Sequence, residues 1–439
     1  MLAPLTMERL LALSAIPACD ISEGARAMAR LSLFDWLTVS RAGSDQPLAR
    51  IMRDFVAAEG GEPAATVAGL AQRVPARAAA LANGTISHAL DYDDTHFAHV
   101  GHPSVAVMPA ALAVGEQGDR SASAVLDAFL LGAEASIRVG IVLGRQHYER
   151  GFHQTATAGA FGASLAASRL MQLSRDETRN ALSLVSTRAS GLKSQFGSMG
   201  KPYNAGLAAS NGVETAALAK LGFVSCDDGV GGLQGFIDAH VDEVFESEAW
   251  SKELFLFENV KHKLHACCHG LHATIEALRE VQGRSGLDPE RVAKLSVRVN
   301  PRWLRVCDIK APRTGLEAKF SYAMTSAMTL FGVDTAAEHT YTDALCGDPR
   351  LVAFGKLVDV RDDPGLSDTA ARVWVELTDG SKLEGAHDLA APVAAAALER
   401  GLRAKACALL GAAVAAELWS GVAACERLSA RALGHLLNG

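Results

Sequence analysis

Long hydrophobic runs are missing from this sequence of 439 residues. No apolar run reaches the roughly 18 residues that a membrane-spanning helix needs, so no membrane span is predicted. The apolar N-terminal stretch contains Glu8 and Arg9 and has no basic segment before it, which predicts a helix start and not a signal peptide. The formal net charge is −7 and most Lys and Arg residues are scattered. A nucleic-acid partner is therefore not expected.

Cysteine pairs with metal-binding or disulfide spacing are missing as well. Eight cysteines are spread over the chain, only Cys267 and Cys268 are adjacent, and no C-x-x-C occurs. This distribution argues against a disulfide framework, a zinc ribbon or a cysteine-held iron–sulfur cluster, and it favours reduced thiols in a cytoplasmic protein. The sequence also lacks the G-x-S-x-G of serine hydrolases, the phosphate-binding loop and the dinucleotide-binding fingerprint.

Aromatic residues are scarce at 6%, whereas 49% of the chain is hydrophobic and Ala, Leu and Gly dominate. This composition predicts closely packed helices, and the length exceeds what one hydrophobic core usually serves. The character of the sequence changes after residue 270, where strand-like alternation begins. We therefore predict a mainly-α fold with a large helical domain (1–269 and 391–439) and a smaller α+β domain (270–390).

Local signals predict several elements in more detail. Residues 291–300 and 371–385 alternate as strands, and Asp379-Gly380 inside the second range is typical of a hairpin turn. A helix is predicted to begin at Val74-Pro75 and to end at Asn83-Gly84. Two further helices are predicted, one starting at a capping box at Ser174–Glu177 and one over residues 334–344.

Residues 83–104 have the highest density of ionisable side chains in the chain. They hold three carboxylates and four histidines: Asp91, Asp93, Asp94, His88, His96, His99 and His102. Three other irregular segments carry similar chemistry, namely 151–155 with His153, 197–204 with Lys201, and 261–272 with two lysines, four histidines and two cysteines. Together they predict a composite active site.

A bound metal is one interpretation of these histidines and carboxylates. However, His96, His99 and His102 do not follow the spacing of known zinc enzymes, and residues 261–272 contain no H-E-x-x-H. A metal-dependent hydrolase or lyase therefore stays an alternative hypothesis.

Acid–base chemistry on a small anion fits the residue types better. Removing a proton next to a carboxylate needs a base with a near-neutral pKa, which histidine supplies. It also needs fixed cations for the charge that builds up on the carboxylate. His102 and His153 are candidates for base and acid, in either order, and Lys201 and Lys263 are candidate clamps for carboxylates.

Five motifs occur in an order that resembles the MmgE/PrpD family: NG-x-x-x-H-A-L-D-Y-D-D-T followed by GHPS, GFHQTAT-x-G, FGSMGKPYNAG-x-A-A-x-NG, K-x-x-x-C-C-x-x-x-H, and TGLEAKFS. The resemblance implies a large all-helical domain and a smaller α+β lid domain, usually in a homodimer. It also implies cofactor-free chemistry on a small di- or tricarboxylate. The family includes 2-methylcitrate dehydratase, cis-aconitate decarboxylase and iminodisuccinate epimerase, so dehydration, decarboxylation and epimerisation all stay open.

The family motifs also imply roles for individual residues. Catalytic roles fall on His102, His153, Lys201 and Lys263, and substrate-binding roles on Asp91, Thr95, Met199 and His272. Asp93 and Asp94 are expected to cap and brace the loop, and His96 and His99 to be bystanders.

The chain departs from the family pattern where substrate shape would be read. Ala266 replaces the usual proline before the paired cysteines, and Met324 stands where relatives often carry an aromatic residue. The substrate therefore cannot be copied from a relative. A non-catalytic, carboxylate-binding member of the family is the remaining alternative.

Overall fold

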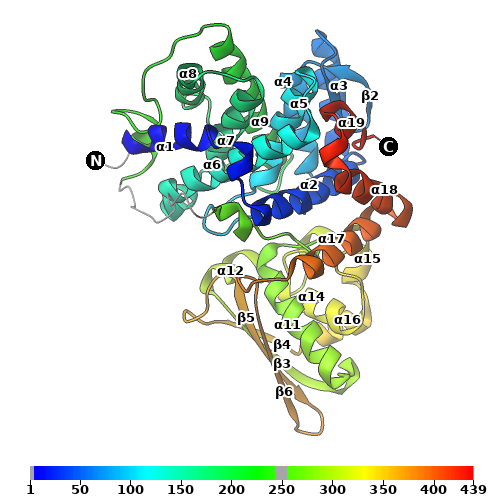
Figure 1. Cartoon of the computed structure of the whole chain (residues 1–439). Helices are drawn as coiled ribbons and strands as arrows, with labels where there is room; N and C mark the ends of the chain where they lie inside the picture. The colour runs from blue at the N-terminus through cyan, green and yellow to red at the C-terminus, as the bar shows by residue number, and fades with distance from the viewer. Residues whose placement is uncertain (1–3, 243–254, 439) are drawn as a thin grey trace. The chain divides into compact units, whose positions relative to one another are not determined.

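The structure is a computed structural model that describes residues 4–242 and 255–438. The chain forms two compact units: Met1–His262 with Leu410–Gly439, here called the helical unit, and Lys263–Leu409, here called the mixed unit. Figure 1 shows the elements of both units. The predicted domain boundaries, at residues 270 and 391, stay predictions. Among the residues described, no helix combines the length and the apolar character that crossing a membrane would require.

The helical unit is built from these elements: α1 (Pro4–Ser14), α2 (Glu23–Gly43), α3 (Pro47–Glu59), β1 (Ala65–Val67), β2 (Leu70–Val74), α4 (Ala76–Ser87), α5 (Pro103–Gln117), α6 (Ala122–Glu149), α7 (Gln154–Leu170), α8 (Arg175–Val185), α9 (Gly200–Lys220), α10 (Phe236–His240), α18 (Ala412–Ala423) and α19 (Ala430–His435). Short 3-10 turns include η2 (Lys193–Gln195) and η4 (Leu256–Asn259). The two C-terminal helices return to this unit, where α18 packs on α2 and α19 on α5. The capping box predicted at Ser174–Glu177 is confirmed at the start of α8.

Small residues make up the centre of the helical unit. Helices α5, α6, α7 and α9 pack on one another there. Every residue of α7 except Arg169 is buried, and Ala, Gly, Ser and Thr make up most of the helix. Small side chains allow helix backbones to approach closely, so the core forms without many aromatic residues. This packing fixes the start of α5, α7 and α9, where the site described below lies.

The predicted end of a helix at Asn83-Gly84 is wrong, because α4 continues through both residues to Ser87. Gly84 lies where α9 crosses α4: a Cβ atom added to Gly84 would lie 2.7 Å from the Cα atom of Gly206. The Asn83 side chain holds the neighbouring hairpin, accepting a hydrogen bond from Ala68 N and donating one to Thr66 O. Both residues serve tertiary packing and do not form a turn.

Replacing Gly84 with alanine should therefore destabilise the fold. The added methyl group collides with backbone, which cannot move aside as a flexible side chain can, and overpacking of this kind typically costs about 1–3 kcal/mol. Gly283 in the mixed unit is the matched control, since a Cβ atom there meets no atom within 4 Å. Gly283→Ala should be neutral or stabilising by up to about 1 kcal/mol. Equal free energies of unfolding for the two variants in urea would contradict this account of α4.

The mixed unit is a sheet with helices: α11 (His269–Ser285), β3 (Val292–Val299), α12 (Pro301–Cys307), α13 (Gly315–Ala318), α14 (Tyr322–Leu330), α15 (Asp343–Cys346), α16 (Pro349–Gly355), β4 (Val358–Asp362), β5 (Ala370–Leu377), β6 (Lys382–Asp388) and α17 (Ala395–Leu410). The strand order is β4-β3-β5-β6, with β3 parallel to β4 and antiparallel to β5. The predicted hairpin is confirmed: β5 and β6 are antiparallel neighbours, and Gly380 in their turn has a φ of +83°.

Helix α11 packs on β5 and β6. Along β5, buried residues such as Val373 and Val375 alternate with exposed ones such as Arg372 and Glu376, as expected when one face of an antiparallel sheet is covered. The helix predicted over residues 334–344 is wrong for most of its length. Only η6 (Glu338–Thr340) and the start of α15 are helical there. The Asp334 carboxylate and the Thr340 hydroxyl bond nearby backbone groups instead, which competes with a helix.

The predicted fold class is confirmed: a large, mainly α-helical unit accompanies a smaller α+β unit. One detail differs from an all-helical large domain. A two-stranded antiparallel hairpin, β1 and β2, lies between α3 and α4. Its Thr66 donates hydrogen bonds from N and Oγ1 to the buried Glu116 carboxylate of α5.

Candidate active site

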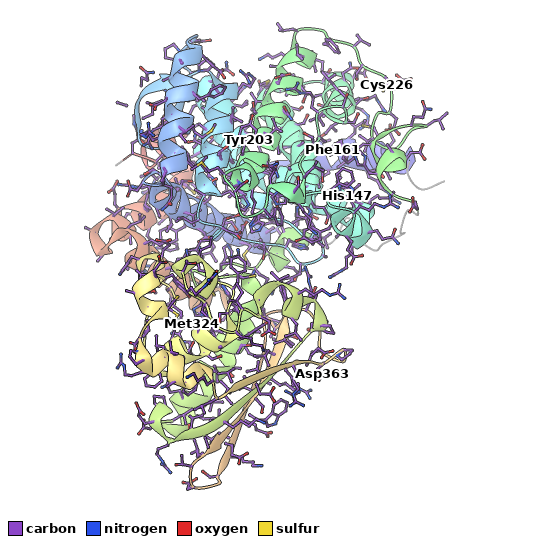
Figure 2. The ribbon with its side chains drawn as sticks, turned by 180° about the vertical axis from the view of Figure 1, so that it is seen from behind. His147, Phe161, Tyr203, Cys226, Met324 and Asp363 are labelled. Atoms are coloured by element: carbon purple, nitrogen blue, oxygen red, sulfur yellow. The ribbon has the colours of Figure 1, made fainter. Side chains whose placement is uncertain are left out.

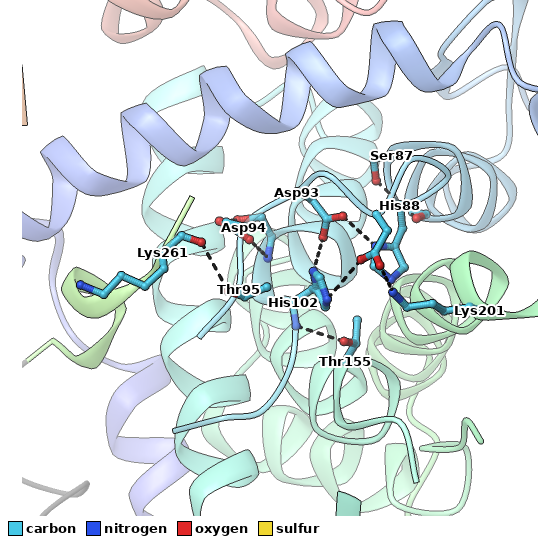
Figure 3. Close-up of polar contacts among 12 residues, drawn as sticks. Ser87, His88, Asp93, Asp94, Thr95, His102, Thr155, Lys201 and Lys261 are labelled. Carbon is cyan, nitrogen blue, oxygen red and sulfur yellow. Dashed lines mark hydrogen bonds and ion pairs between the residues drawn. The ribbon is translucent and has the colours of Figure 1, made fainter. Parts of the chain in front are cut away.

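Three helices of the helical unit begin at one cluster of ionisable side chains. His102 is the N-cap residue of α5, His153 is the N-cap residue of α7, and Lys201 is the second residue of α9. The three helices pack on one another, and Figure 3 shows His102 and Lys201 among the polar contacts at this point. Helix N-termini carry partial positive charge and favour bound anions. The predicted base, acid and clamp therefore meet where the N-termini of three helices come together.

Asp93 lies between two histidines. Its Oδ2 atom accepts a hydrogen bond from His102 Nδ1 at 2.8 Å, and its Oδ1 atom accepts one from His88 Nδ1 at 2.8 Å. Burial opposes ionisation of this carboxyl, but the charges and hydrogen bonds of the two imidazoles hold the pKa of Asp93 well below its usual range. Because Asp93 fixes the proton of His102 on Nδ1, the Nε2 atom of that ring is left as an acceptor.

Asp91 connects His102 with Lys201. Its Oδ2 atom lies 2.6 Å from Lys201 Nζ, and its Oδ1 atom lies 3.6 Å from His102 Nε2. The backbone of Asp91 has a φ of +51°, in the left-handed region that non-glycine residues rarely adopt. Such strain often accompanies functional positions. The Asp91 side chain is 37% exposed and that of Lys201 16%, so this ion pair is more accessible than the buried Asp93.

His153 is held as a neutral ring with a defined tautomer. Burial lowers its pKa well below the usual value, and the nearby His88 and Lys201 lower it further. The Nδ2 atom of Asn204 lies 3.2 Å from His153 Nδ1. Because an amide NH2 group only donates, this contact leaves the His153 proton on Nε2. The ring of Phe196 contacts His153 edge-on, with the two centroids 4.9 Å apart.

The loop between α4 and α5 is held in place by its own side chains Asp94, His96 and His99. Asp94 accepts hydrogen bonds from the N and Oγ atoms of Ser104 at the start of α5. His96 Nε2 contacts Leu256 O at 3.1 Å, and His96 Nδ1 accepts a hydrogen bond from His99 N. The His99 ring is fully buried, and a Cβ atom added to Gly140 would collide with it. Burial lowers the pKa of His96 to about 4 and that of His99 well below its usual value.

Asp94 gives the fold a predictable pH dependence. Burial raises the pKa of Asp94 from 3.8 to about 7, against the hydrogen bonds from Ser104, which lower it. Between these two pH values the folded chain holds a proton that the unfolded chain has released, so the free energy of unfolding falls as pH rises. Asp94→Asn removes this titration and should stabilise the protein more at pH 8 than at pH 5. Urea unfolding at both pH values tests this; an equal effect of Asp94→Asn at the two would contradict it.

The remaining predicted site residues are placed differently. Thr95 forms an isolated antiparallel bridge with Lys261, with backbone hydrogen bonds of 2.8 and 2.7 Å, and its side chain is part-exposed. Met199, the N-cap residue of α9, is 48% exposed at the edge of the cluster. Lys263 and His272 are buried in the mixed unit, so their predicted roles stay predictions.

Sequence reasoning left four residues of the cluster without a site role: His88, Asp93, Phe196 and Asn204. Asp93 was expected only to brace the loop, yet it contacts two imidazole rings. The signal available in the sequence was that Asp93 has a histidine five residues before it (His88) and another nine residues after it (His102). Phe196 and Asn204 lie in the lysine-loop motif, but only the fold brings them to His153.

The two departures from the family pattern are both buried in the mixed unit. Ala266 donates a backbone hydrogen bond to Thr335 O at 2.8 Å, which a proline could not make. Met324, labelled in Figure 2, lies on α14. Its N atom donates a hydrogen bond to the N-cap hydroxyl of Ser321. Only the Ala266 hydrogen bond depends on the departure, because the Met324 hydrogen bond uses a backbone N–H that an aromatic residue also has.

The geometry also bears on metal binding. His88, Asp91, Asp93 and His102 each offer one ligand atom, all within 4.8 Å of one another. However, both Nδ1 atoms already donate to Asp93, and the Lys201 ammonium pairs with Asp91. A cation bound through those Nδ1 atoms would have to displace their protons, and one bound to Asp91 would compete with the lysine. The imidazole ligands of a cation here would therefore be the Nε2 atoms.

The fold brings two histidines, a lysine and two aspartates together at the ends of packed helices. The model of the MmgE/PrpD N-terminal domain matches residues 13–247, and the model of the MmgE/PrpD C-terminal domain matches residues 265–417. The chain belongs to the MmgE/PrpD family.

Curated proteins with similar sequences have cis-aconitate decarboxylase names. Cis-aconitate decarboxylase-like protein oryM of Aspergillus oryzae is 32% identical over 284 residues, which cover 60% of this chain and 58% of that protein. Cis-aconitate decarboxylase of Aspergillus terreus is 32% identical over 237 residues (50% and 48%). Cis-aconitate decarboxylase of Homo sapiens is 34% identical over 155 residues (34% and 32%). The chain thus spans between about a third and three fifths of the length of these relatives.

Proposed function

We propose that this chain is a cofactor-independent lyase, of dehydratase or decarboxylase type, that acts on a small di- or tricarboxylate. The observation that carries the proposal is the meeting of His102, His153 and Lys201 at the starts of three packed helices. Membership of the MmgE/PrpD family and the names of the relatives support the same class of reaction.

The proposed roles follow from which atoms are already engaged. His102 Nε2 accepts the proton from the carbon next to a carboxylate, since Nδ1 is bonded to Asp93. The electron pair moves toward that carboxylate, which Lys201 holds after exchanging its partner Asp91 for the substrate. In a dehydration, His153 Nε2–H hydrogen-bonds the leaving hydroxyl, which departs as water with the proton that His102 took up. In a decarboxylation the breaking C–C bond supplies the electron pair, CO2 leaves, and a protonated histidine delivers the proton to carbon.

Deuterium exchange tests this proposal without assuming the final step. The protein is incubated in heavy water with a panel of di- and tricarboxylates, and proton NMR follows the C–H signals. We expect at least one acid to exchange a C–H next to a carboxylate, or to form a dehydrated or decarboxylated product. Binding in a thermal-shift assay without exchange or product would indicate the non-catalytic alternative. Exchange accompanied by inversion of configuration, with no dehydrated or decarboxylated product, would favour an epimerase.

A chelator separates the metal-dependent alternative. Protein treated with a chelator and desalted should keep its exchange activity, because the proposed steps use only side chains. Loss of activity that returns with zinc or magnesium would overturn the proposed mechanism.

We also propose a homodimer in the cytoplasm. The eight cysteines form no disulfide, which supports a reducing compartment. Light scattering coupled to size-exclusion chromatography measures the mass in solution. A mass equal to that of one chain would contradict the dimer.

A further inference from the structure

His88 is a buried imidazole that the proposed mechanism does not use. It follows α4 as the C-cap residue, and its side chain is 0% exposed. Its Nδ1 atom donates to Asp93 Oδ1, whereas its Nε2 atom is buried and has no hydrogen-bond partner among the described residues. Burying a polar atom without a partner costs free energy, so a residue kept in this position needs a reason.

The His88 ring lies between the two proposed catalytic histidines. Its centroid is 4.6 Å from that of His102, with the rings edge to face, and 6.0 Å from that of His153, with the rings nearly parallel. His88 thus limits the space in which either ring could turn. Figure 3 shows His88 and His102 on the two sides of the Asp93 carboxylate.

His88 also supplies one of the two imidazole hydrogen bonds that Asp93 accepts. The Asp93 side chain is 1% exposed, so water cannot readily replace a lost donor. Without His88, Oδ1 would lose this hydrogen bond, and the carboxylate could turn or bond His102 through either oxygen. Its negative charge would then be shared with one imidazole and not with two.

We propose that His88 is a positioning residue, whose Nδ1–H fixes the Asp93 carboxylate and thereby the orientation and tautomer of His102. The inference rests on the proposed function, because it assigns His88 to the same proton-transfer step. His88 does not touch the substrate in this scheme; it acts through Asp93.

Other charged groups also surround His102 and must be held constant in any test. They are Asp91, Asp93 and His99 of the loop, Asp94 beside Asp93, His153 at the start of α7 and Lys201 of α9. A variant at position 88 changes none of these residues. Because the His88 ring also contacts the His102 ring directly, only a difference between a variant that keeps the donor to Asp93 and one that lacks it reports the contact through Asp93.

Two substitutions separate hydrogen bonding from packing. Asparagine can place an amide N–H close to the position of His88 Nδ1, so His88→Asn keeps the donor to Asp93. Phenylalanine fills similar space without a donor, so His88→Phe removes it. Circular dichroism and thermal unfolding show whether both variants fold.

The first readout needs no substrate. Ring nitrogen NMR of 15N-histidine-labelled protein, with the His102 signals assigned by their loss in His102→Asn, reports the tautomer and titration of His102. We expect the Nδ1–H tautomer in wild type and His88→Asn. In His88→Phe the negative charge of Asp93 interacts with the His102 imidazole alone. It should therefore stabilise protonated His102 more strongly and shift the titration of His102 upward by about 0.5–1 pH unit. Identical His102 spectra and titrations in all three proteins would overturn the inference.

The second readout uses the acid found by deuterium exchange. His88→Phe should lower kcat about 10–100-fold with little change in KM, and His88→Asn should restore most of the loss. The acidic limb of the kcat/KM profile should move to higher pH in His88→Phe only. If His102→Asn is inactive but both position-88 variants behave as wild type, the inference fails and the proposed function stands. If His102→Asn keeps full activity, the proposed function itself fails.

Discussion

His102→Asn should lower kcat by about 10²–10⁴-fold, the range expected when a positioned general base is removed. Asparagine can still donate to Asp93, so the loop should keep its structure while the Nε2 acceptor is lost. The expected result is a folded protein with an unchanged thermal midpoint and almost no deuterium exchange. Turnover and exchange are measured on the same preparation, which separates loss of chemistry from loss of folding.

His435→Asn is the matched control for this substitution. His435 is an exposed histidine of α19 in the same unit and has no proposed part in the chemistry. Its replacement should leave kcat within about twofold, because surface substitutions of this kind have small effects. A His102→Asn protein that turns over as fast as His435→Asn would remove His102 from the mechanism.

Lys201→Met should lower kcat/KM by about 10²–10⁴-fold. Methionine keeps much of the length of the side chain but removes the cation that the proposed substrate carboxylate needs, both for binding and for the charge that develops during reaction. The substitution also leaves Asp91 without its partner at 2.6 Å, so an unpaired carboxylate would repel an anionic substrate. We expect kcat and KM both to worsen.

Lys193→Met provides the control, in the 3-10 turn η2 that precedes the segment of Lys201. Lys193 Nζ donates a hydrogen bond to Tyr148 O at 3.0 Å and lies 3.7 Å from the centroid of the Tyr148 ring, and it has no proposed part in the chemistry. Its loss should change kcat/KM by less than about threefold. Steady-state kinetics on both variants, with thermal unfolding alongside, distinguish a carboxylate clamp from a general need for positive charge. Equal losses in the two variants would contradict the role given to Lys201.

Some elements could be read directly from the chain because their signals are local. The Asp379-Gly380 turn requires a left-handed backbone that glycine adopts easily, and the hairpin is present where the alternation predicts it. The capping box at Ser174 and Glu177 is likewise a contact between residues three apart. Such features depend on neighbouring residues, so the sequence alone predicts them.

Other elements were decided by distant contacts. Asn83-Gly84 reads as a turn, yet α4 continues because α9 packs against Gly84 at Gly206. Conversely, residues 334–344 carry helical periodicity but form mostly irregular structure, where Thr335 O accepts a hydrogen bond from Ala266 N and Asp343 Oδ1 accepts one from Gly315 N. Local preference is weak compared with burial and backbone packing, which the sequence does not display.

The chain by itself therefore determined the fold class and the types of residue available for acid–base chemistry. It also indicated His102, His153 and Lys201, since these stand beside helix starts in irregular segments. Only the tertiary structure decided that Asp93 joins His88 to His102, and that Asp91 pairs with Lys201. The physical reason is that a hydrogen bond requires two atoms within about 3 Å. That proximity arises from the packing of α4, α5 and α9, which carry His88, His102 and Lys201 at their ends.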